Sequence, residues 1–171
     1  MNTKIHKTEV TYKEKQLIFS MLNKISLFGG LTVGELECLI PLLTTESLKK
    51  GETVFDQGES PNNIFIIQSG EVKIVKQQDD IEIELIRFYE GNLFGETELI
   101  GIFKYIASAI ALTDLKLLVF PKSALYSLHS KNIKLFSKII LNVARESCRR
   151  TAKTDQYWLD EMVKLRKNNK E

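Results

Sequence analysis

The pattern of hydrophobic and polar residues first predicts helices. Apolar side chains recur at helical spacing from Tyr12 to Ile25, which indicates one amphipathic helix. A second helix is expected to begin at Thr32, because Thr32 and Glu35 have the spacing of a capping box. Pro41 lies in this segment and predicts that the helix kinks or ends early. The apolar face of this second helix comprises Leu36, Leu39, Ile40 and Leu43.

From about residue 47 the hydrophobic period changes to two, which predicts strands. Apolar and polar residues alternate over Ile81–Leu85, as they do in half-buried antiparallel strands. Turn signals such as Asp79-Asp80 separate these segments at short intervals, so a β-sandwich or barrel is expected. Ala107–Leu112 and Leu115–Phe120 are predicted to form two further strands.

Near residue 121 the pattern becomes helical again. Pro121 suits the first turn of a short helix, and one long helix is expected after Ser130. A stripe of residues on the long helix steps by threes and fours; it is apolar, then polar from Ser147 to Asp155, then apolar again. Because such a helix is too long to be buried against a small barrel, residues 133–165 are expected to pair with a second copy in a homodimer. The stripe comprises Ile133, Phe136, Ile140, Val143, Ser147, Arg150, Thr154, Tyr157 and Leu165.

Composition and charge narrow the class of protein. The hydrophobic (43%) and charged (27%) fractions are those of an ordinary globular domain. The net charge of +2 hides an uneven distribution, since residues 131–171 carry 11 Lys/Arg and 5 Asp/Glu and residues 1–130 carry 13 and 17. The cluster Arg145, Arg149 and Arg150 is expected to form a solvated helix face. No apolar run is long enough to span a membrane and no signal peptide is evident, so a cytoplasmic protein without membrane contact is expected.

Few residues offer catalytic or metal-binding chemistry. Cys38 and Cys148 lie far apart without metal-ligand spacing and are expected to be reduced, with one disulfide as the alternative. His6 and His129 have no carboxylate or cysteine at ligand spacing, so no metal and no cofactor are expected. The chain contains no nucleophile elbow and no Ser/His/Asp constellation, and a non-enzymatic protein is therefore expected.

One stretch around residue 95 carries candidate binding chemistry. Phe94 is expected to end a strand, and Gly95 lets the backbone turn tightly. Amides at the start of a helical turn suit a phosphate, and the Glu96 carboxylate is suited to accept a hydrogen bond from a hydroxyl such as a ribose 2′-OH. The alternative is an ordinary turn and strand, since such short motifs are common. The next strand adds a hydroxyl between small residues: Ala107, Ser108 and Ala109.

Four short motifs follow one another along the chain: Lys50-Gly51-Glu52, Gln57-Gly58-Glu59, Ile67-Gln68-Ser69-Gly70-Glu71-Val72 and Phe94-Gly95-Glu96. Their order and spacing resemble the cyclic nucleotide-binding domain family, which includes the catabolite activator protein and the regulatory subunit of protein kinase A. The resemblance covers Ser26 to the middle of the final helix. It implies an α+β, mainly β fold, in which a double-stranded β-helix (a jelly-roll-like β-roll) is flanked by N-terminal helices and a long C-terminal helix. The parts are residues 1–25 (tail and helix), 26–130 (β-roll) and 131–171 (dimerisation and lid helix).

The resemblance also implies a ligand and its site. The ligand is expected to be cAMP, cGMP or a related phosphorylated compound, whose phosphate meets backbone amides, an Arg and a Ser/Thr and whose ribose meets a Glu. In the polar part of the final helix, Thr151 and Thr154 are expected to contact the base, or else to set the register of the helix pair. The positions that match the family motif are Gly95, Glu96, Ala107 and Ser108. The candidate site as a whole comprises Phe94, Gly95, Glu96, Thr97, Lys104, Tyr105, Ala107, Ser108, Thr151 and Thr154.

One position departs from the family pattern, since Tyr105 occupies the place of the phosphate-binding Arg. Losing one partner of such a charge pair costs about 2–5 kcal/mol of binding free energy. The substitutes to consider are Lys104, the Tyr105 hydroxyl and Arg87. Two functions stay open: a sensor that signals through the C-terminal helix to an effector protein, and a dimeric protein-interaction scaffold with a degenerate site. DNA binding by this chain alone is not expected, because too few residues follow Leu165 for a recognition helix.

Overall fold

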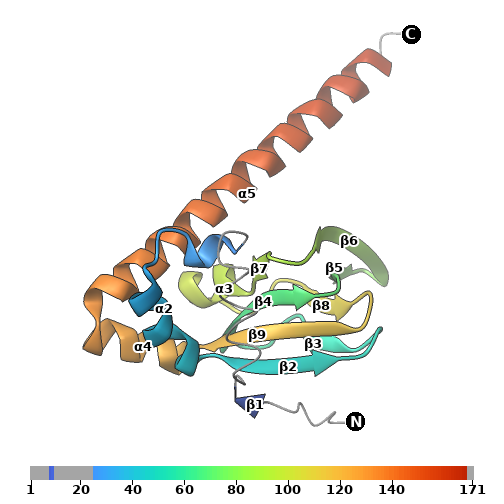
Figure 1. The fold of residues 1–171 in the computed structure, drawn as a ribbon. Helices are drawn as coiled ribbons and strands as arrows, with labels where there is room; N and C mark the ends of the chain where they lie inside the picture. The colour runs from blue at the N-terminus through green and yellow to red at the C-terminus, as the bar shows by residue number, and fades with distance from the viewer. Residues whose placement is uncertain (1–7, 10–24, 169–171) are drawn as a thin grey trace.

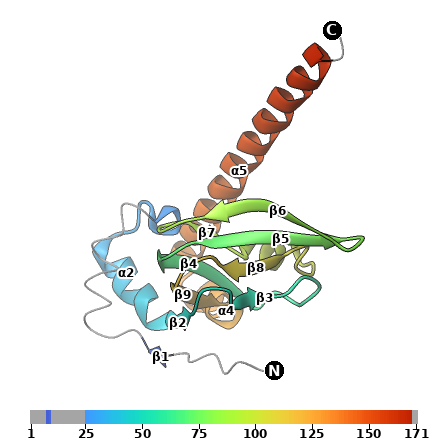
Figure 2. The same cartoon turned by 90° about the vertical axis from the view of Figure 1, so that its right-hand side faces the viewer.

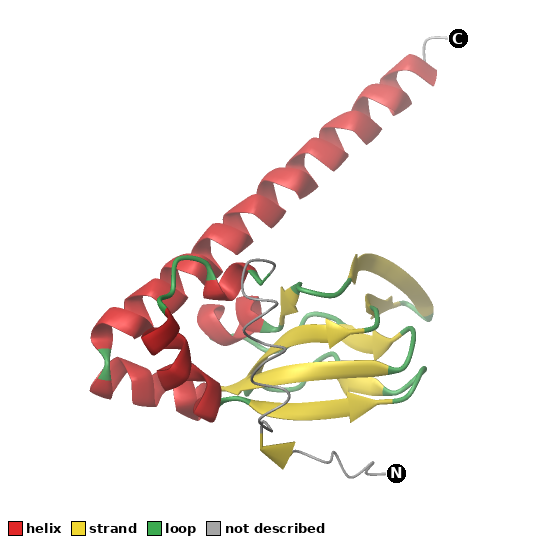
Figure 3. Ribbon diagram, viewed as in Figure 1, coloured by secondary structure: helices red, strands yellow, loops and turns green. Residues whose placement is uncertain are grey.

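The computed structural model describes residues 8–9 and 25–168, so the helix predicted from Tyr12 lies outside the described residues. The described chain forms two antiparallel sheets, with helices gathered at one end and one long helix extending away from them (Figures 1 and 3). The helical elements are η1 (Ser26–Phe28), α2 (Val33–Leu39), η2 (Ile40–Leu42), α3 (Glu96–Gly101), α4 (Lys122–Lys131) and α5 (Ile133–Asn168).

The two sheets confirm the predicted β-roll. The larger sheet has the strand order β1-β2-β9-β4-β7, and the smaller sheet has the order β3-β8-β5-β6. The predicted strands that flank Thr113-Asp114 exist as β8 and β9, one in each sheet, and Pro121 is the last residue of β9 rather than the first of α4. The strands are β1 (Thr8–Glu9), β2 (Thr44–Leu48), β3 (Thr53–Phe55), β4 (Asn63–Ser69), β5 (Val72–Gln78), β6 (Ile81–Phe88), β7 (Leu93–Phe94), β8 (Ser108–Ala111) and β9 (Leu115–Pro121).

The helix that follows Thr32 forms as predicted. The Thr32 side chain accepts a hydrogen bond from the Glu35 backbone N–H, and the Glu35 carboxylate accepts one from the Thr32 N–H, so the capping box is complete. The α-helix ends at Leu39, and Pro41 lies in the 3-10 turn η2 that follows it. The predicted apolar face packs into the core, with Leu36, Leu39, Ile40 and Leu43 all buried.

The β5–β6 hairpin turns at Asp79-Asp80, where both residues adopt positive φ angles (51° and 62°) as a two-residue hairpin requires. The expectation that Ile81–Leu85 is half-buried is wrong, because the side chains of Ile81, Ile83 and Leu85 are exposed. The cause is position: β6 is the outermost strand of the smaller sheet, and the hairpin projects at one edge of the molecule (Figure 2). Alternation predicts which residues share a face, but not whether that face is covered.

Only the first part of the long helix α5 packs against the body. Its buried side chains are Leu135, Ile139, Asn142 and Val143, so the predicted stripe beginning at Ile133 is offset from the buried face. The Asn142 amide donates hydrogen bonds to the backbone carbonyls of Leu27 (3.0 Å) and Gly29 (2.8 Å) and thereby fixes α5 to η1. Contacts with the body continue to Arg150 and Thr154, and beyond them α5 extends away from the body, as its length predicted (Figure 1).

Five aromatic rings fill the space between the two sheets: Phe55, Phe65, Phe88, Phe94 and Tyr105. Neighbouring rings in this aromatic cluster lie 3.6–6.0 Å apart between centroids. The cluster packs beneath the turn at Gly95, since Phe94 is at its centre. It therefore gives the candidate site a rigid floor.

Candidate functional site

The turn at Gly95 forms as the sequence predicts. Strand β7 ends at Phe94, Gly95 adopts a φ of +79°, and α3 begins at Glu96. A side chain at position 95 would be strained at this φ, and its Cβ would lie 3.1 Å from a ring carbon of Phe65 and 3.3 Å from the Asn63 carbonyl oxygen. Glycine therefore lets the start of α3 lie directly against β4.

A pocket of about 300 Å³ lies where the smaller sheet, the start of α3 and the helix α5 meet. We call it the helix pocket. Two of its lining residues, Arg150 and Thr154, come from α5. Its polar or charged lining residues also include Thr97 and Glu98, and its other lining residues are Phe55, Ile74, Leu85, Ile86, Phe88, Phe94, Gly95, Ile106 and Ala107. The walls are thus mainly apolar, with polar groups supplied by α3 and α5.

The central polar contact of this region joins Glu96 to Arg150. Glu96 is fully buried, and its Oε1 forms an ion pair with the Arg150 guanidinium, whose side chain is 21% exposed. The same Glu96 oxygen accepts a hydrogen bond from the Thr97 hydroxyl at 3.0 Å. Its second oxygen, Oε2, is buried without a hydrogen bond to any described residue. A buried carboxylate with only part of its acceptor capacity used is a costly group, and such groups mark candidate binding sites.

Arg150 is held on three sides. Besides the ion pair, it donates a hydrogen bond to the Leu93 carbonyl (3.4 Å), and its guanidinium lies over the Phe88 ring, 5.4 Å from the centroid. Burial lowers the pKa of Arg150 from its usual value. The expectation of a solvated helix face is therefore wrong for Arg150, although its neighbour Arg149 does lie on the surface and pairs with Glu146.

Tyr105, the residue in place of the family's Arg, is part of the core. Its ring stacks on Phe55 with centroids 3.6 Å apart and planes 8° from parallel. Its backbone is held at both polar groups, because its N–H donates to the Glu59 carbonyl (2.9 Å) and its carbonyl accepts from the Gly58 N–H (2.8 Å). Burial, and secondarily the carboxylates of Glu98 and Glu59, raise the pKa of the Tyr105 hydroxyl. Tyr105 therefore stays neutral and does not line the pocket.

The substitutes considered for the missing Arg do not reach the helix pocket in this structure. Lys104 is exposed and is not among the lining residues. Arg87 lies on the exposed strand β6 and pairs with Glu84, 2.6 Å away. The cation that does enter the pocket is Arg150, which the sequence places both in the polar part of the helix stripe and in a basic cluster expected to be solvated.

The other predicted site residues divide into two groups. Phe94, Gly95, Thr97, Ala107 and Thr154 line the pocket, and the Thr154 hydroxyl donates to the Arg150 carbonyl within α5. Glu96, Ser108 and Thr151 are not lining residues: Glu96 reaches the pocket through Arg150, the Ser108 hydroxyl accepts from the Gln57 N–H (2.8 Å), and Thr151 donates to the Ser147 carbonyl.

Glu98 is a lining residue that the sequence did not single out. It lies two residues after Glu96 on α3, with its side chain half-buried at the pocket wall. Burial raises the pKa of its carboxyl above the ordinary value of 4.5. The pocket therefore holds one arginine and one lining glutamate, with a second glutamate directly behind the arginine.

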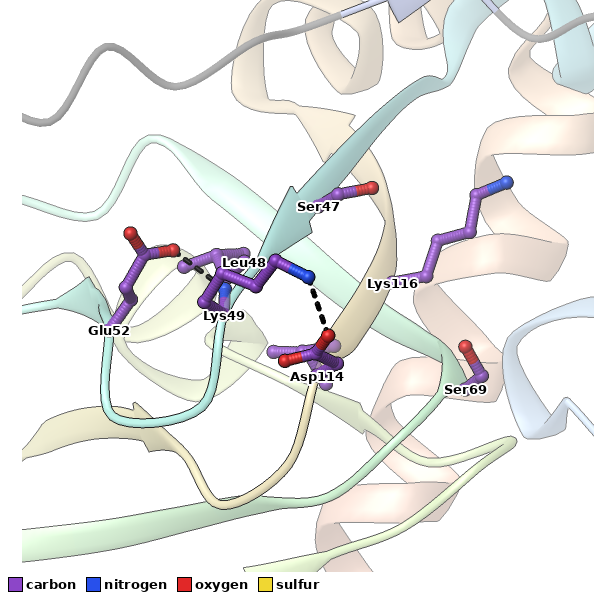
Figure 4. A pocket seen from close by; sticks show the side chains of 8 residues that line it. Ser47, Leu48, Lys49, Glu52, Ser69, Asp114 and Lys116 are labelled. Carbon is purple, nitrogen blue, oxygen red and sulfur yellow. Dashed lines mark hydrogen bonds and ion pairs between the residues drawn. The ribbon is translucent and has the colours of Figure 1, made fainter.

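A second pocket of similar volume, about 300 Å³, lies at the surface where one end of β2, β4 and β9 meets the adjoining loops (Figure 4). We call it the loop pocket; its lining residues include Ser47, Glu52, Ser69 and Lys116. Three of its charged residues contact one another: the Lys49 ammonium pairs with Asp114 at 2.6 Å, and the Lys49 N–H donates to Glu52 at 2.7 Å. The Lys49 and Asp114 side chains are exposed and paired, and no lining side chain of the loop pocket is among the buried, unpartnered groups of the described residues.

Comparison with known proteins identifies the family. Residues 45–132 match the family model of the cyclic nucleotide-binding domain. The chain belongs to this family. A cAMP-dependent protein kinase type II regulatory subunit of Drosophila melanogaster is 27% identical over 52% of the chain, and a cAMP-dependent protein kinase regulatory subunit of Schizosaccharomyces pombe is 29% identical over 67% of it. These matches cover 24% and 27% of the relatives' own sequences, and the chain spans a third or less of the curated relatives it matches first.

The fold has a close counterpart among solved structures. A cyclic nucleotide-binding domain from Methylobacillus flagellatus KT superposes with a TM-score of 0.81 at 21% identity, covering 92% of this chain and 89% of that one.

Among residues 8–9 and 25–168, no helix has the length and hydrophobicity needed to cross a bilayer, and no group of three His, Cys, Asp or Glu side chains is placed to hold a metal ion. Family membership therefore directs attention to the cassette at Gly95–Glu96 and the pocket beside it.

Proposed function

We propose that this chain is a regulatory, non-enzymatic sensor domain that binds a ligand of nucleotide type in the helix pocket and signals through α5. Family membership supports the ligand class, with cAMP and cGMP as the first candidates. The single observation that carries the signalling role is the ion pair between Glu96 of the cassette and Arg150 of α5. Through this pair, the occupancy of the pocket and the position of α5 depend on the same two side chains.

The proposed mechanism is that the ligand and Arg150 share Glu96. A ligand hydroxyl that donates a hydrogen bond to Glu96 Oε2, which has no partner among the described residues, lowers the negative charge that the carboxylate presents to Arg150 without displacing it. The weaker ion pair loosens the contact of α5 near residue 150, while Asn142 still fixes its first part to η1. Ligand binding thus shifts α5 between two positions, and a partner protein reads the change.

Hydrogen exchange of the full chain tests this mechanism. Saturating ligand is expected to change amide exchange in the α5 segment around residues 147–157 towards the pattern of Arg150→Ala, which loses the ion pair outright. Arg149→Ala is the matched control, because Arg149 pairs only with Glu146 on the helix surface. The probes are cAMP, cGMP, adenosine and guanosine, with binding followed in parallel by calorimetry. A probe that binds without altering exchange in α5 would show that the helix is not the output.

A second candidate function, a dimeric interaction scaffold with an unused pocket, rests on a different observation. The second half of α5 carries large apolar side chains that are 43–62% exposed: Tyr157, Trp158, Leu159, Met162, Val163 and Leu165. Trp158, Met162 and Leu165 follow one another at helical spacing, as in a helix–helix interface. We propose a homodimer through residues 133–165 in either case, in a reducing compartment such as the cytoplasm that suits the free cysteines Cys38 and Cys148.

Light scattering after size exclusion separates the two candidates. The pair Trp158→Ser/Met162→Ser is expected to yield a monomer, whereas Asp160→Ser/Lys164→Ser on the opposite side of the helix is expected to stay dimeric. If the wild type is a dimer and none of the four probes binds at millimolar concentration, the scaffold is the function. A wild type that is monomeric at high micromolar concentration excludes the scaffold.

A further inference from the structure

The charges of the helix pocket constrain which ligand it accepts. Among its described lining residues, one is a cation (Arg150) and one is an acid (Glu98). The cation is already engaged, because Arg150 forms the ion pair with the fully buried Glu96. The pocket therefore presents no uncommitted positive charge to a ligand.

Arg150 cannot serve Glu96 and a ligand anion equally well. If its guanidinium turned to a phosphate, Glu96 would remain buried as a carboxylate without a cation, and burying an unpaired charge is strongly unfavourable. If Arg150 stayed on Glu96, the phosphate itself would lie unpaired beside Glu98. Protonation of Glu98 removes the repulsion but supplies no cation. Each arrangement leaves one anion uncompensated in a mainly apolar site.

The position where a cation would relieve this conflict is closed by packing. Tyr105 lies in the aromatic cluster with its ring stacked on Phe55 at 3.6 Å, and both of its backbone polar groups are bonded to the Gly58–Glu59 segment. Rotating the ring out would open a cavity between the sheets, which the surrounding core resists. Neither Lys104 nor Arg87 lines the pocket, as described above.

The same pocket is well suited to a neutral ligand with hydrogen-bond donors. The Glu98 carboxyl places oxygen atoms at the wall, and Glu96 Oε2, a buried acceptor without a partner among the described residues, lies behind Arg150 rather than at the wall. The rings of Phe88 and Phe94 and the side chains of Ile74 and Ile106 provide apolar surface for a flat group. A volume of about 300 Å³ is at the small end for ligand sites.

From this distribution we infer that the pocket selects an uncharged, nucleoside-type ligand over its cyclic phosphate counterpart. The inference rests on the proposed function, because it names the ligand form that the sensor site takes. A flat base occupies the apolar walls, and sugar hydroxyls or an exocyclic amine donate to the Glu98 carboxyl at the wall and to Glu96 directly behind Arg150. Removing the phosphate removes the one group for which the pocket has no free partner.

Binding calorimetry with two matched pairs tests the inference: adenosine against cAMP, and guanosine against cGMP. For the wild type, at least one nucleoside is expected to bind about tenfold or more tightly than its own cyclic phosphate. Raising the salt concentration is expected to narrow this gap, since screening weakens the repulsion felt by the anion alone. Tighter binding of both cyclic nucleotides overturns the inference and leaves the sensor function standing. Absence of binding by all four overturns the sensor function itself.

Two variants make the charge argument specific. Glu98→Ala removes the lining acid and is expected to shift the preference several-fold towards the cyclic nucleotides, whereas Glu37→Ala, an exposed acid on α2, leaves the preference unchanged. If Glu98→Ala leaves the ratio of affinities within twofold of the wild type, the lining charge does not select the ligand and the inference fails.

Discussion

Two pockets of similar volume each have an ion pair beside them, and the two pairs differ in how far they are buried. The charges of the buried pair depend on each other far more than those of the exposed pair do. At the helix pocket Glu96 is fully buried and Arg150 largely so, and the pair joins the cassette to a helix 54 residues further along the chain. At the loop pocket the side chains of Lys49 and Asp114 are 79% and 66% exposed. Water solvates the exposed charges whether or not they touch, whereas the buried charges depend on each other.

This difference shows why volume alone does not locate a functional site. Both pockets measure about 300 Å³, but the loop pocket has the exposed Lys49–Asp114 pair, whereas a buried carboxylate with an unpartnered oxygen, that of Glu96, lies directly behind Arg150 at the helix pocket. A ligand gains most where it can satisfy a group that the protein has already desolvated. This contrast supports the proposal that the ligand binds in the helix pocket and that the Glu96–Arg150 pair transmits its binding to α5.

The largest expected effect comes from breaking the buried pair. Arg150→Ala leaves Glu96 buried without a cation and is expected to lower the free energy of unfolding by about 3–5 kcal/mol. Urea denaturation followed by circular dichroism measures the loss. Arg149→Ala, which removes a surface arginine from the next position, is the control and is expected to change stability only slightly.

Removing both charges refines this prediction. Glu96→Gln/Arg150→Met replaces the pair by neutral groups of similar size, and it is expected to be less destabilised than Arg150→Ala because no uncompensated charge remains. A double variant that loses more stability than Arg150→Ala would mean that lost packing, rather than an orphaned charge, dominates. Arg150 does pack on the Phe88 ring, so the comparison separates two real contributions.

The sequence predicted the local parts of this site and missed its long-range parts. Gly95 and the turn of helix after it follow from local backbone rules, and so does the capping box at Thr32. The Glu96–Arg150 contact depends instead on how α5 docks, which the helical period of the polar stretch from Ser147 does not specify. Arg150 was part of that polar stretch, but a period alone cannot distinguish a solvated arginine from one turned inward.

Tyr105 and strand β6 illustrate the same limit. Counting along the cassette placed Tyr105 where the family has an Arg, but its ring is held by Phe55, 50 residues earlier in the chain, a contact with no local signal. The alternating residues of β6 formed the predicted strand, yet its edge position left Ile81 and Ile83 exposed. In each case the missing information was which distant element covers the side chain.

A smaller effect is expected from Glu98, which lies at the pocket without an ion pair to any described residue. Burial raises its pKa above 4.5, so the folded protein holds this proton more tightly than the unfolded chain does. Its contribution to stability is therefore fully present below about pH 4.5 and is lost as the pH rises through the raised pKa. As the pH rises from about 4.5 through the raised pKa of Glu98, the free energy of unfolding of the wild type is expected to fall relative to that of Glu98→Gln, as measured by urea denaturation. Glu37→Gln serves as the surface control, and a difference that grows in the opposite direction would contradict the burial of Glu98.

The smallest effect is expected at the exposed pair. Lys49→Met breaks the contact with Asp114, and in that pair the mutual hydrogen bond raises the pKa of Lys49 and lowers the pKa of Asp114. Since solvent replaces the lost partner on both sides, the denaturation midpoint is expected to stay within error of the wild type at physiological salt, as it is for Lys50→Met beside it. A loss at Lys49→Met comparable to that of Arg150→Ala would mean that burial does not separate the two pairs. The assignment of a mechanical role to Arg150 would then lose its physical basis.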